Sequence, residues 1–209
     1  MPRQINHAII VSHPSQESFT LAIAKRYAQA VEALGQRSFI RDLYQIGFDP
    51  LLKEEERHGR PGADVLAEWE LLRDADIFVL VYPIWFGAPP AMLTGYIDRV
   101  FGAGRVTGQP QNHAASNLLE GKQLVSLQLS GNMRAWLHER GVMMSLRNLF
   151  DRYLSEVFGL PETHSYHFDG ITQDMSRKDA AFHLAAVDDA AKAVMAHVRR
   201  EWQQMPPSG

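Results

Sequence analysis

Cysteine is absent from this chain of 209 residues, and no histidines stand in a metal-binding spacing. Without cysteine there is neither a disulfide framework nor a thiolate metal site, which is compatible with a reducing cytoplasm. The nine histidines form no HExxH motif or similar tight cluster. His164 and His167 lie three residues apart on an expected strand, so their side chains face opposite sides of it. We therefore expect no metal site.

Strong charge of one sign and long uninterrupted apolar runs are also lacking. The formal net charge is −3 and no run of Lys and Arg occurs, which argues against a nucleic-acid partner. The apolar run 8–11 is too short for a signal peptide, so we expect a cytoplasmic protein. Residues 77–97 carry no charge, but three prolines and two glycines interrupt them, so we expect no membrane insertion.

The order of apolar patterns predicts an α/β fold. Apolar runs of strand length alternate with segments in which apolar residues recur at helical spacing. The expected strands are 5–11, 37–42, 77–82, 123–129 and 163–168. The expected helices are 18–34, 64–74, 92–101, 143–158 and 176–202, whereas 43–63 and 102–117 look irregular, with a solvated loop or short exposed helix at 53–62. This predicts a single domain over 1–209, with a frayed tail at 203–209, built on an open five-stranded parallel sheet doubly wound with helices on both faces.

The segment 12–18 joins the first expected strand directly to the first expected helix. The first N–H groups of a helix have no partner inside it, and the helix dipole favours negative charge there. The segment lacks the glycine pattern of a dinucleotide site and the Gly-Lys-Ser/Thr of a P-loop. Hydroxyl donors gather around the same point at Ser12, Ser15, Ser18 and Thr20. We therefore expect a phosphate of another kind to bind here.

A second loop, residues 82–90, places two large aromatic side chains at the mouth of the expected sheet. Trp85 could stack on a flat ring, and we expect the N–H groups from Ile84 to Gly87 to be free to bind it, because a strand has just ended. A phosphate at one loop and a flat heterocycle at the next describe a flavin nucleotide. These loops and 130–142 all follow strands, so they should meet at the edge where doubly wound sheets bind ligands.

Three motifs carry a resemblance to a known family. They are His13-Pro-x-x-x-Ser18-Phe19; Asp42-Leu43-Tyr44 with Phe48-Asp49-Pro50; and Tyr82-Pro-x-Trp85-Phe86-Gly87 continued by Pro90-Ala91-x-Leu93-x-Gly95-x-x-Asp98-Arg99-Val100-Phe101. Over residues 1–170 the chain resembles the flavodoxin-like NAD(P)H:quinone oxidoreductases, the DT-diaphorase group and its bacterial relatives. The resemblance implies a flavodoxin-like fold, FMN (alternatively FAD) as cofactor and NAD(P)H as co-substrate. It also implies a ping-pong mechanism with two-electron hydride transfer through flavin N5 to a quinone or similar flat acceptor.

The same resemblance implies a set of site residues. The flavin phosphate and ribityl chain would be held by His13, Ser18, Phe19 and Thr20. The isoalloxazine would be lined by Pro83, Ile84, Trp85 and Phe86, and its pyrimidine edge by the loop Gln128, Leu129, Ser130 and Gly131. A tyrosine and a histidine that assist hydride transfer in the diaphorase have no clean match, and Trp136 and His138 are nearest to their positions. Glu17, an acid in the phosphate loop, should point to solvent.

The resemblance further implies a homodimer with its active site at the interface. Residues 102–117 and 132–142 are long connections, and such connections are usually functional. We expect a helix face with Tyr96, Val100 and Phe101 to pack against a second copy, and 132–142 to act as a flap over the acceptor. We interpret Asp98 and Arg99 as an exposed or intersubunit ion pair.

Two other functions are compatible with a flavin site. One, which the resemblance to some members of the family implies, is a regulatory flavoprotein subunit, peripherally associated with a membrane transporter of the potassium-efflux type. The other is a one-electron carrier, which the mild net charge of −3 disfavours because such carriers are strongly acidic. The acceptor (a quinone, a nitro compound or an azo dye) and the choice between NADH and NADPH remain open at this point.

Overall fold

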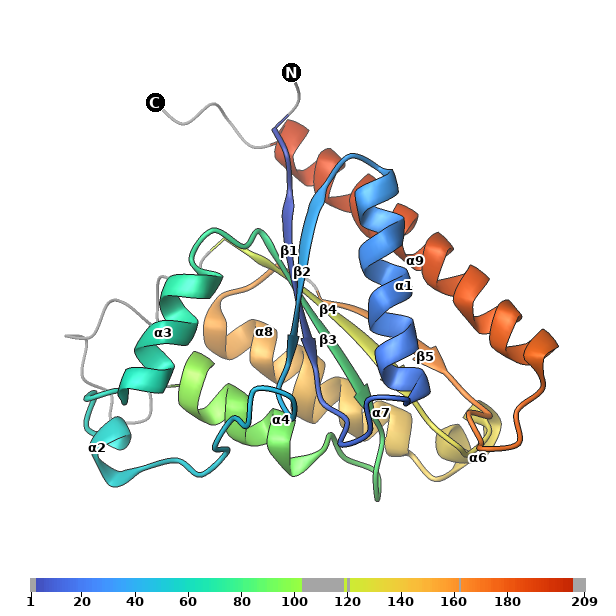
Figure 1. The fold of residues 1–209 in the computed structure, drawn as a ribbon, viewed down its shortest axis with the longest axis horizontal. Helices are drawn as coiled ribbons and strands as arrows, with labels where there is room; N and C mark the ends of the chain where they lie inside the picture. Colours follow the sequence, from blue (N-terminus) through green and yellow to red (C-terminus); the bar gives the residue numbers. More distant parts are fainter. Residues whose placement is uncertain (1–2, 103–118, 120, 162, 205–209) are drawn as a thin grey trace.

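A five-stranded parallel sheet forms the centre of the computed structural model, which describes residues 3–102, 119, 121–161 and 163–204 (Figure 1). The strands are β1 (Asn6–Val11), β2 (Arg37–Asp42), β3 (Ile77–Pro83), β4 (Gln123–Leu129) and β5 (His164–Phe168). Their order is β2-β1-β3-β4-β5, and every neighbouring pair is parallel. The expected fold class is confirmed, and each expected strand is present within a residue or so of its expected bounds.

The central strands are apolar because both faces of the sheet are covered. All seven residues of β3 are buried, as are all seven of β4. Along β3 the side chains alternate between two cores. Val79 and Val81 belong to the core under α1 and α9, whereas Phe78 and Leu80 belong to the core on the opposite face. This alternation decides which side chains of each strand can reach the site.

Helices form a layer on each side of the sheet (Figure 1). One face carries α1 (Phe19–Ala33) and α9 (Arg177–Gln204). The other carries α3 (Ala63–Leu72), α4 (Ala91–Tyr96), the π-helical turns η1 (Ile97–Phe101) and η2 (Arg147–Arg152), and α8 (Tyr153–Phe158). The expected helix 92–101 therefore runs through α4 and η1, and 143–158 through α7 (Val142–Leu146), η2 and α8. Because α9 reaches Gln204, residues 203–204 are helical rather than frayed, and 205–209 lie outside the described residues.

Two connecting segments contain short helices. Within 53–62, the short helix that was one of the two expected alternatives is present as α2 (Glu54–Arg57), but it is not exposed throughout, because its Glu56 is only 1% exposed. Within 132–142, α6 covers Arg134–Glu139, so this connection is not an irregular loop. The other long connection, 102–117, lies almost entirely outside the described residues.

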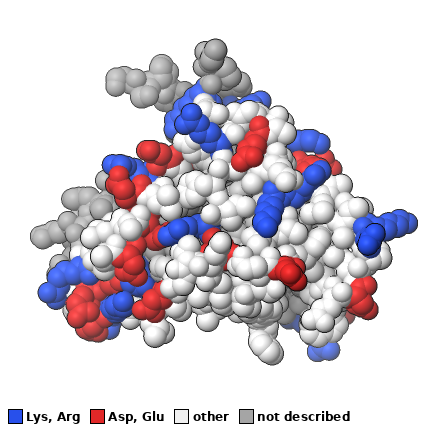
Figure 2. Space-filling model, viewed as in Figure 1, with Lys and Arg blue, Asp and Glu red and all other residues white. Residues whose placement is uncertain are grey.

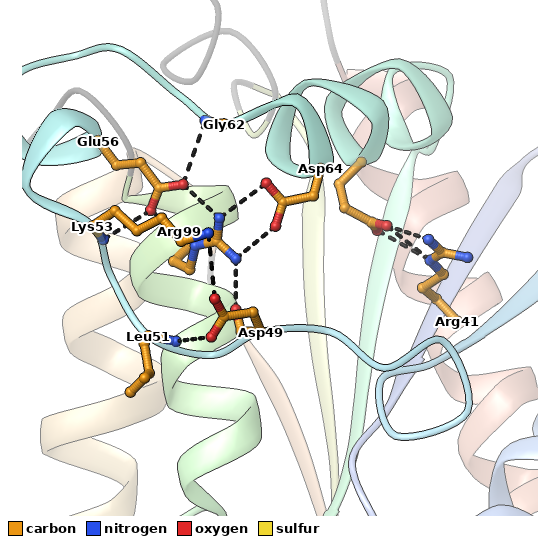
Figure 3. A network of polar contacts seen from close by, with 9 residues as sticks. Arg41, Asp49, Leu51, Lys53, Glu56, Gly62, Asp64 and Arg99 are labelled. Carbon is orange, nitrogen blue, oxygen red and sulfur yellow. Dashed lines mark hydrogen bonds and ion pairs between the residues drawn. The ribbon is translucent and has the colours of Figure 1, made fainter.

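Arg99 is the largest fully buried side chain among the described residues, and the expected exposed ion pair with Asp98 is wrong. Its guanidinium donates to Glu56 at 2.8 and 2.5 Å, to Asp64 at 3.0 Å and to the carbonyl of Asp49 at 2.6 Å (Figure 3). The reason is that η1 turns this side chain under the segment from β2 to α3, away from the surface. Arg99 thus ties that segment to the sheet's helical layer.

The helix face expected at a dimer interface is part of the core instead. Tyr96 and Val100 are 0% exposed and Phe101 is 1% exposed. Phe101 packs edge to face against Phe78 of the sheet, with ring centroids 5.4 Å apart. A second copy of the chain therefore cannot reach these side chains, and that part of the assembly prediction is corrected.

Charges of both signs are mixed over part of the face that Figure 2 shows. In Figure 2 acidic and basic side chains alternate over the part of this face that α2 and α3 form. Among the described residues, no helix combines the length and apolarity that a membrane span requires.

Candidate functional site

The site lies at the carboxyl edge of the sheet, where the loops after β1, β3, β4 and β5 come together. The strand order places β1 beside β3, and the chain reverses its winding direction there, which is where doubly wound sheets bind ligands. A cleft of about 590 Å³ opens at this edge, which we call the switch-point cleft. Its lining consists of His13, Ser15, Glu17, Ser18, Phe19, Thr20, Ala22, Pro83, Ile84, Trp85, Leu129, Ser130, Gly131, Ile171, Thr172, Gln173 and Met175.

The loop after β1 presents hydrogen-bond donors at the start of α1. Ser18 is the N-cap, and its Oγ accepts the N–H of Leu21 at 3.2 Å. Phe19 and Thr20 lie in the first turn of α1, where no carbonyl of the helix can accept their N–H groups, so these groups remain available to a ligand. The loop is braced from within, because the N–H of Ser15 donates to His13 Nδ1 at 3.0 Å. Glu17 is exposed as expected, yet it also lines the cleft.

The loop after β3 ends in a tight turn. Trp85 N–H donates to the carbonyl of Ala88 at 2.9 Å, and the N–H of Ala88 donates to the carbonyl of Trp85 at 3.0 Å. Phe86 and Gly87 between them both have positive φ, 52° and 80°, as a type I′ turn requires. Glycine satisfies that need freely, whereas Phe86 is held in a conformation that non-glycine residues rarely adopt.

This turn corrects two expectations about the aromatic loop. The N–H of Ile84 donates to the carbonyl of Leu129 at 2.7 Å, so neither it nor the N–H of Trp85 is free to bind a ligand. The ladder between β3 and β4 continues one residue past Pro83, which the end of the apolar run did not reveal. Trp85 lines the cleft, and its ring centroid is 5.8 Å from that of His13, whereas Phe86 projects into solvent and does not line it.

The loop after β4 contributes three of its four expected residues. Leu129, Ser130 and Gly131 line the cleft, and Gln128 does not. Strand alternation turns Gln128 to the opposite face, where its Nε2 donates to Tyr82 Oη at 3.0 Å and to Asp151 at 3.2 Å. The N–H of Ser130 is taken by the carbonyl of Phe168 at 2.9 Å. The Ser130 hydroxyl donates to the carbonyl of Asn132 at 2.7 Å, which leaves the Gly131 N–H of this loop to bind a ligand.

One lining segment, residues 171–175, has no counterpart among the expected site residues. It follows β5, and the N–H of Ile171 donates to the carbonyl of Ser130 at 2.9 Å, which fixes the segment beside the β4 loop. The rule that strand ends meet at one edge could have found it, because β5 was expected to end at the same edge.

The two candidate residues for hydride transfer do not line the switch-point cleft in this structure. Trp136 lies on α6, is 46% exposed, and has the Arg140 guanidinium 5.6 Å from its ring centroid. His138, on the same helix, lines a neighbouring cavity. Among the described residues, no three His, Cys, Asp or Glu side chains are placed to share a metal ion.

The donor set fits a flavin nucleotide. A phosphate needs N–H and O–H donors at a helix start, and the free amides of Phe19 and Thr20 supply them together with the Ser18 hydroxyl. A flat ring needs apolar walls and a polar edge, and Trp85 and Ile84 line the same cleft as Ser130 and Gly131.

Comparison with known proteins identifies the class. A family model described as the flavodoxin-like fold matches residues 6–194, so the chain belongs to this family. It is 35% identical over 195 residues to an uncharacterized NAD(P)H oxidoreductase of Haemophilus influenzae, covering 90% of this chain and 96% of that protein. The resemblance to the flavodoxin-like NAD(P)H oxidoreductases is thereby confirmed.

Solved structures show the same fold. An NAD(P)H:quinone oxidoreductase from Methanothermobacter marburgensis has a TM-score of 0.76 at 22% identity, over 92% of this chain and 98% of that one. An FMN-dependent NADH-azoreductase from Bacillus anthracis, solved in complex with FMN, has a TM-score of 0.62 at 14% identity, over 92% and 99% of the two chains.

Proposed function

We propose that this protein is a flavin-dependent NAD(P)H oxidoreductase that transfers two electrons as hydride from NAD(P)H to a quinone or similar flat acceptor. The observation that carries the proposal is the switch-point cleft, which combines the donor-rich start of α1 with a wall formed by Trp85. The Haemophilus relative, named as an NAD(P)H oxidoreductase and matched over nearly its whole length, supports the activity. The cysteine-free composition supports a cytoplasmic setting.

FMN is the cofactor we propose, with FAD as the alternative, and the FMN complex of the azoreductase supports this choice. When bound, a flavin supplies the hydride chemistry, and the protein supplies position and charge. The amides of Phe19 and Thr20 with the Ser18 hydroxyl would hold the phosphate. Ile84 and Trp85 would flank the ring, and the Gly131 N–H would favour negative charge at its edge, as an oxyanion hole does.

Steady-state kinetics test the shared-site form of this proposal. If NAD(P)H and acceptor use the cleft in turn, double-reciprocal plots at several acceptor concentrations should give parallel lines. Intersecting lines would contradict alternate use of one site. Because the chemistry requires no metal, EDTA should leave the rate unchanged.

We also propose a homodimer, with the α6 segment as a flap over the acceptor. The exposed Met133, Trp136 and Met144 near the α6–α7 segment offer apolar surface that a second copy could cover. A fully active monomer in sedimentation at assay concentration would contradict the dimer. A regulatory subunit remains the alternative function, and tight binding to a membrane transporter without quinone turnover would favour it.

A further inference from the structure

A second cavity, of about 390 Å³, lies beside the switch-point cleft. It is on the η2 side of β4 and β5, and Gln128, His138, Arg147, Asp151, Ser165 and His167 are among its lining residues. These are polar or charged side chains, whereas the rest of this face of the sheet packs against an apolar core. A cavity with several polar partners on its wall can hold water.

The buried carboxyl of Asp151 maintains this polar environment. Its oxygens accept Ser126 Oγ at 2.9 Å, Gln128 Nε2 at 3.2 Å and Ser165 Oγ at 2.5 Å. Burial nevertheless raises the pKa of Asp151 above its ordinary value. A buried carboxyl carries a desolvation cost that an apolar side chain here would avoid. A buried carboxyl with a raised pKa in a cavity therefore marks this region as a candidate for function rather than packing alone.

Ser130 and His167 connect the cavity with the cleft. Ser130 lines the cleft and His167 lines the cavity, and 2.9 Å separates Ser130 Oγ from His167 Nε2. Ser130 Oγ also donates to the carbonyl of Asn132 at 2.7 Å. Since a hydroxyl has one hydrogen, it is His167 Nε2–H that donates to Ser130. The other nitrogen, Nδ1, is buried and has no hydrogen-bond partner within the described part of the chain.

The proposed reaction needs a proton at the cleft. NAD(P)H gives up a hydride, which carries two electrons and one proton, whereas reduction of a quinone to a hydroquinone takes two electrons and two protons. One further proton per turnover must therefore reach the acceptor from solvent or from a side chain.

We propose that His167 and Ser130 form a relay that delivers this proton from the cavity to the cleft, an inference that rests on the proposed function. A solvent proton enters at His167 Nδ1 and the Nε2 proton passes to Ser130 Oγ. The Ser130 hydroxyl turns from the Asn132 carbonyl toward the cleft and passes its own proton to the acceptor oxygen. One proton enters and one leaves, and the imidazole is neutral before and after. It changes from the Nε2–H to the Nδ1–H tautomer, and proton exchange with water restores the Nε2–H form before the next turnover. His167 acts through Ser130 and does not itself touch the acceptor.

The surroundings of His167 keep it in the neutral form from which a relay starts. Burial is the main influence and lowers the pKa of His167, Asp169 raises it, and Arg134 lowers it. The remaining titratable or charged groups on this cavity are His138 from α6, Arg147 and Asp151 from η2, and His164 from β5.

Exchange of His167 for glutamine tests the relay, because glutamine can still donate to Ser130 but cannot carry a proton. In His167→Gln we expect quinone turnover by the flavin-loaded protein to fall about 100-fold, as for loss of a general acid. Reduction of ferricyanide, which accepts electrons without a proton, should change less than about twofold, far below that acid–base range. The exposed His58→Gln serves as the matched control, with both rates as in the wild type.

In His167→Gln, equal losses with both acceptors, loss of bound flavin, or an unchanged quinone rate would each overturn the relay. A wild-type protein that binds no flavin would instead overturn the proposed function, so the two failures are distinguishable. A readout that needs no flavin is the ¹⁵N spectrum of histidine-labelled protein. It should show His167 as the Nε2–H tautomer in the wild type. In Ser130→Ala, which removes the hydrogen bond that fixes this tautomer, it should show a mixture of the two tautomers. An Nδ1–H tautomer in the wild type would contradict the geometry.

Discussion

Ser18 serves two purposes at once, and the two can be separated. It caps α1, and it presents a hydroxyl where we propose the flavin phosphate to bind. Aspartate is as good an N-cap as serine, but it places a negative charge at the proposed phosphate site. The residue therefore allows a substitution that keeps the fold and removes only the ligand.

In Ser18→Asp we expect flavin binding to be lost, while the melting temperature stays near that of the flavin-free wild type, since bound flavin itself would raise the wild-type value. Ser18→Asn is the matched control, since asparagine caps equally well without charge and should retain most of the flavin. The measurement is flavin content by absorbance after gel filtration. Full flavin content in Ser18→Asp would refute the phosphate assignment.

His7 should make stability depend on pH. It is 0% exposed on β1, 3.3 Å from Tyr27 Oη through its Nδ1, and burial lowers its pKa from 6.5 to about 4. The unfolded chain therefore binds a proton at this residue between these two values and the folded chain does not. Protonation of His7 therefore does not lower the free energy of unfolding above pH 6.5. As the pH falls from 6.5 toward 4, it lowers the free energy of unfolding by about 3 kcal/mol at most.

We predict that His7→Gln removes this part of the pH dependence. The measurement is the free energy of unfolding by urea from pH 7.5 to pH 4 for both proteins. The difference between their slopes should appear only below about pH 6.5, the ordinary pKa of histidine. Parallel curves over the whole range would mean that His7 titrates normally in the folded protein.

At the scale of elements, Arg99 holds the segment from β2 to α3 in place. Its partner Glu56 is 1% exposed, and the pKa of Glu56 is lowered, chiefly by its hydrogen bonds from Arg99 (Figure 3). Nearby, Arg41 of β2 pairs with Glu68 of α3, so a second arginine fastens the same region. A buried charge that loses its partner is far more destabilising than the pair is stabilising.

For Arg99→Met we expect a loss of about 3–5 kcal/mol in the free energy of unfolding at pH 7. The double variant Arg99→Met/Glu56→Gln should regain part of it, because the buried Glu56 charge is removed and the remaining partner, Asp64, is 45% exposed and can be solvated. Since the pKa of Glu56 is lowered, its stabilisation is present above pH 4.5 and is lost as the pH falls below that value. A single variant as stable as the wild type would show that the pair contributes nothing.

The α6 segment is where we expect changes in turnover without changes in flavin content. Trp136 is half exposed and does not line the cleft in this conformation, so a role at the acceptor requires α6 to move. Trp136→Ala should alter the acceptor KM or kcat and leave bound flavin unchanged. Wild-type kinetics in both Trp136→Ala and His138→Ala would contradict the flap.

The strands were predictable from sequence because burial on both sheet faces leaves a continuous apolar run. That the loops of the cleft meet at one place was also predictable, since parallel strands end at the same edge of the sheet. The partners of Arg99 were not predictable, because Glu56 and Asp64 lie 43 and 35 residues away and only the tertiary fold brings them together. The use of the Ile84 N–H by Leu129 likewise depends on the register between β3 and β4.

At the scale of the whole molecule, the account depends on a flavin at the β1–β3 switch point. The visible absorption spectrum of the purified protein, with the mass of the flavin released on denaturation, tests this most directly. We predict a flavin spectrum and one FMN per chain, and release of FAD would change only the identity of the nucleotide. A colourless protein that takes up neither FMN nor FAD on incubation would contradict the central claim.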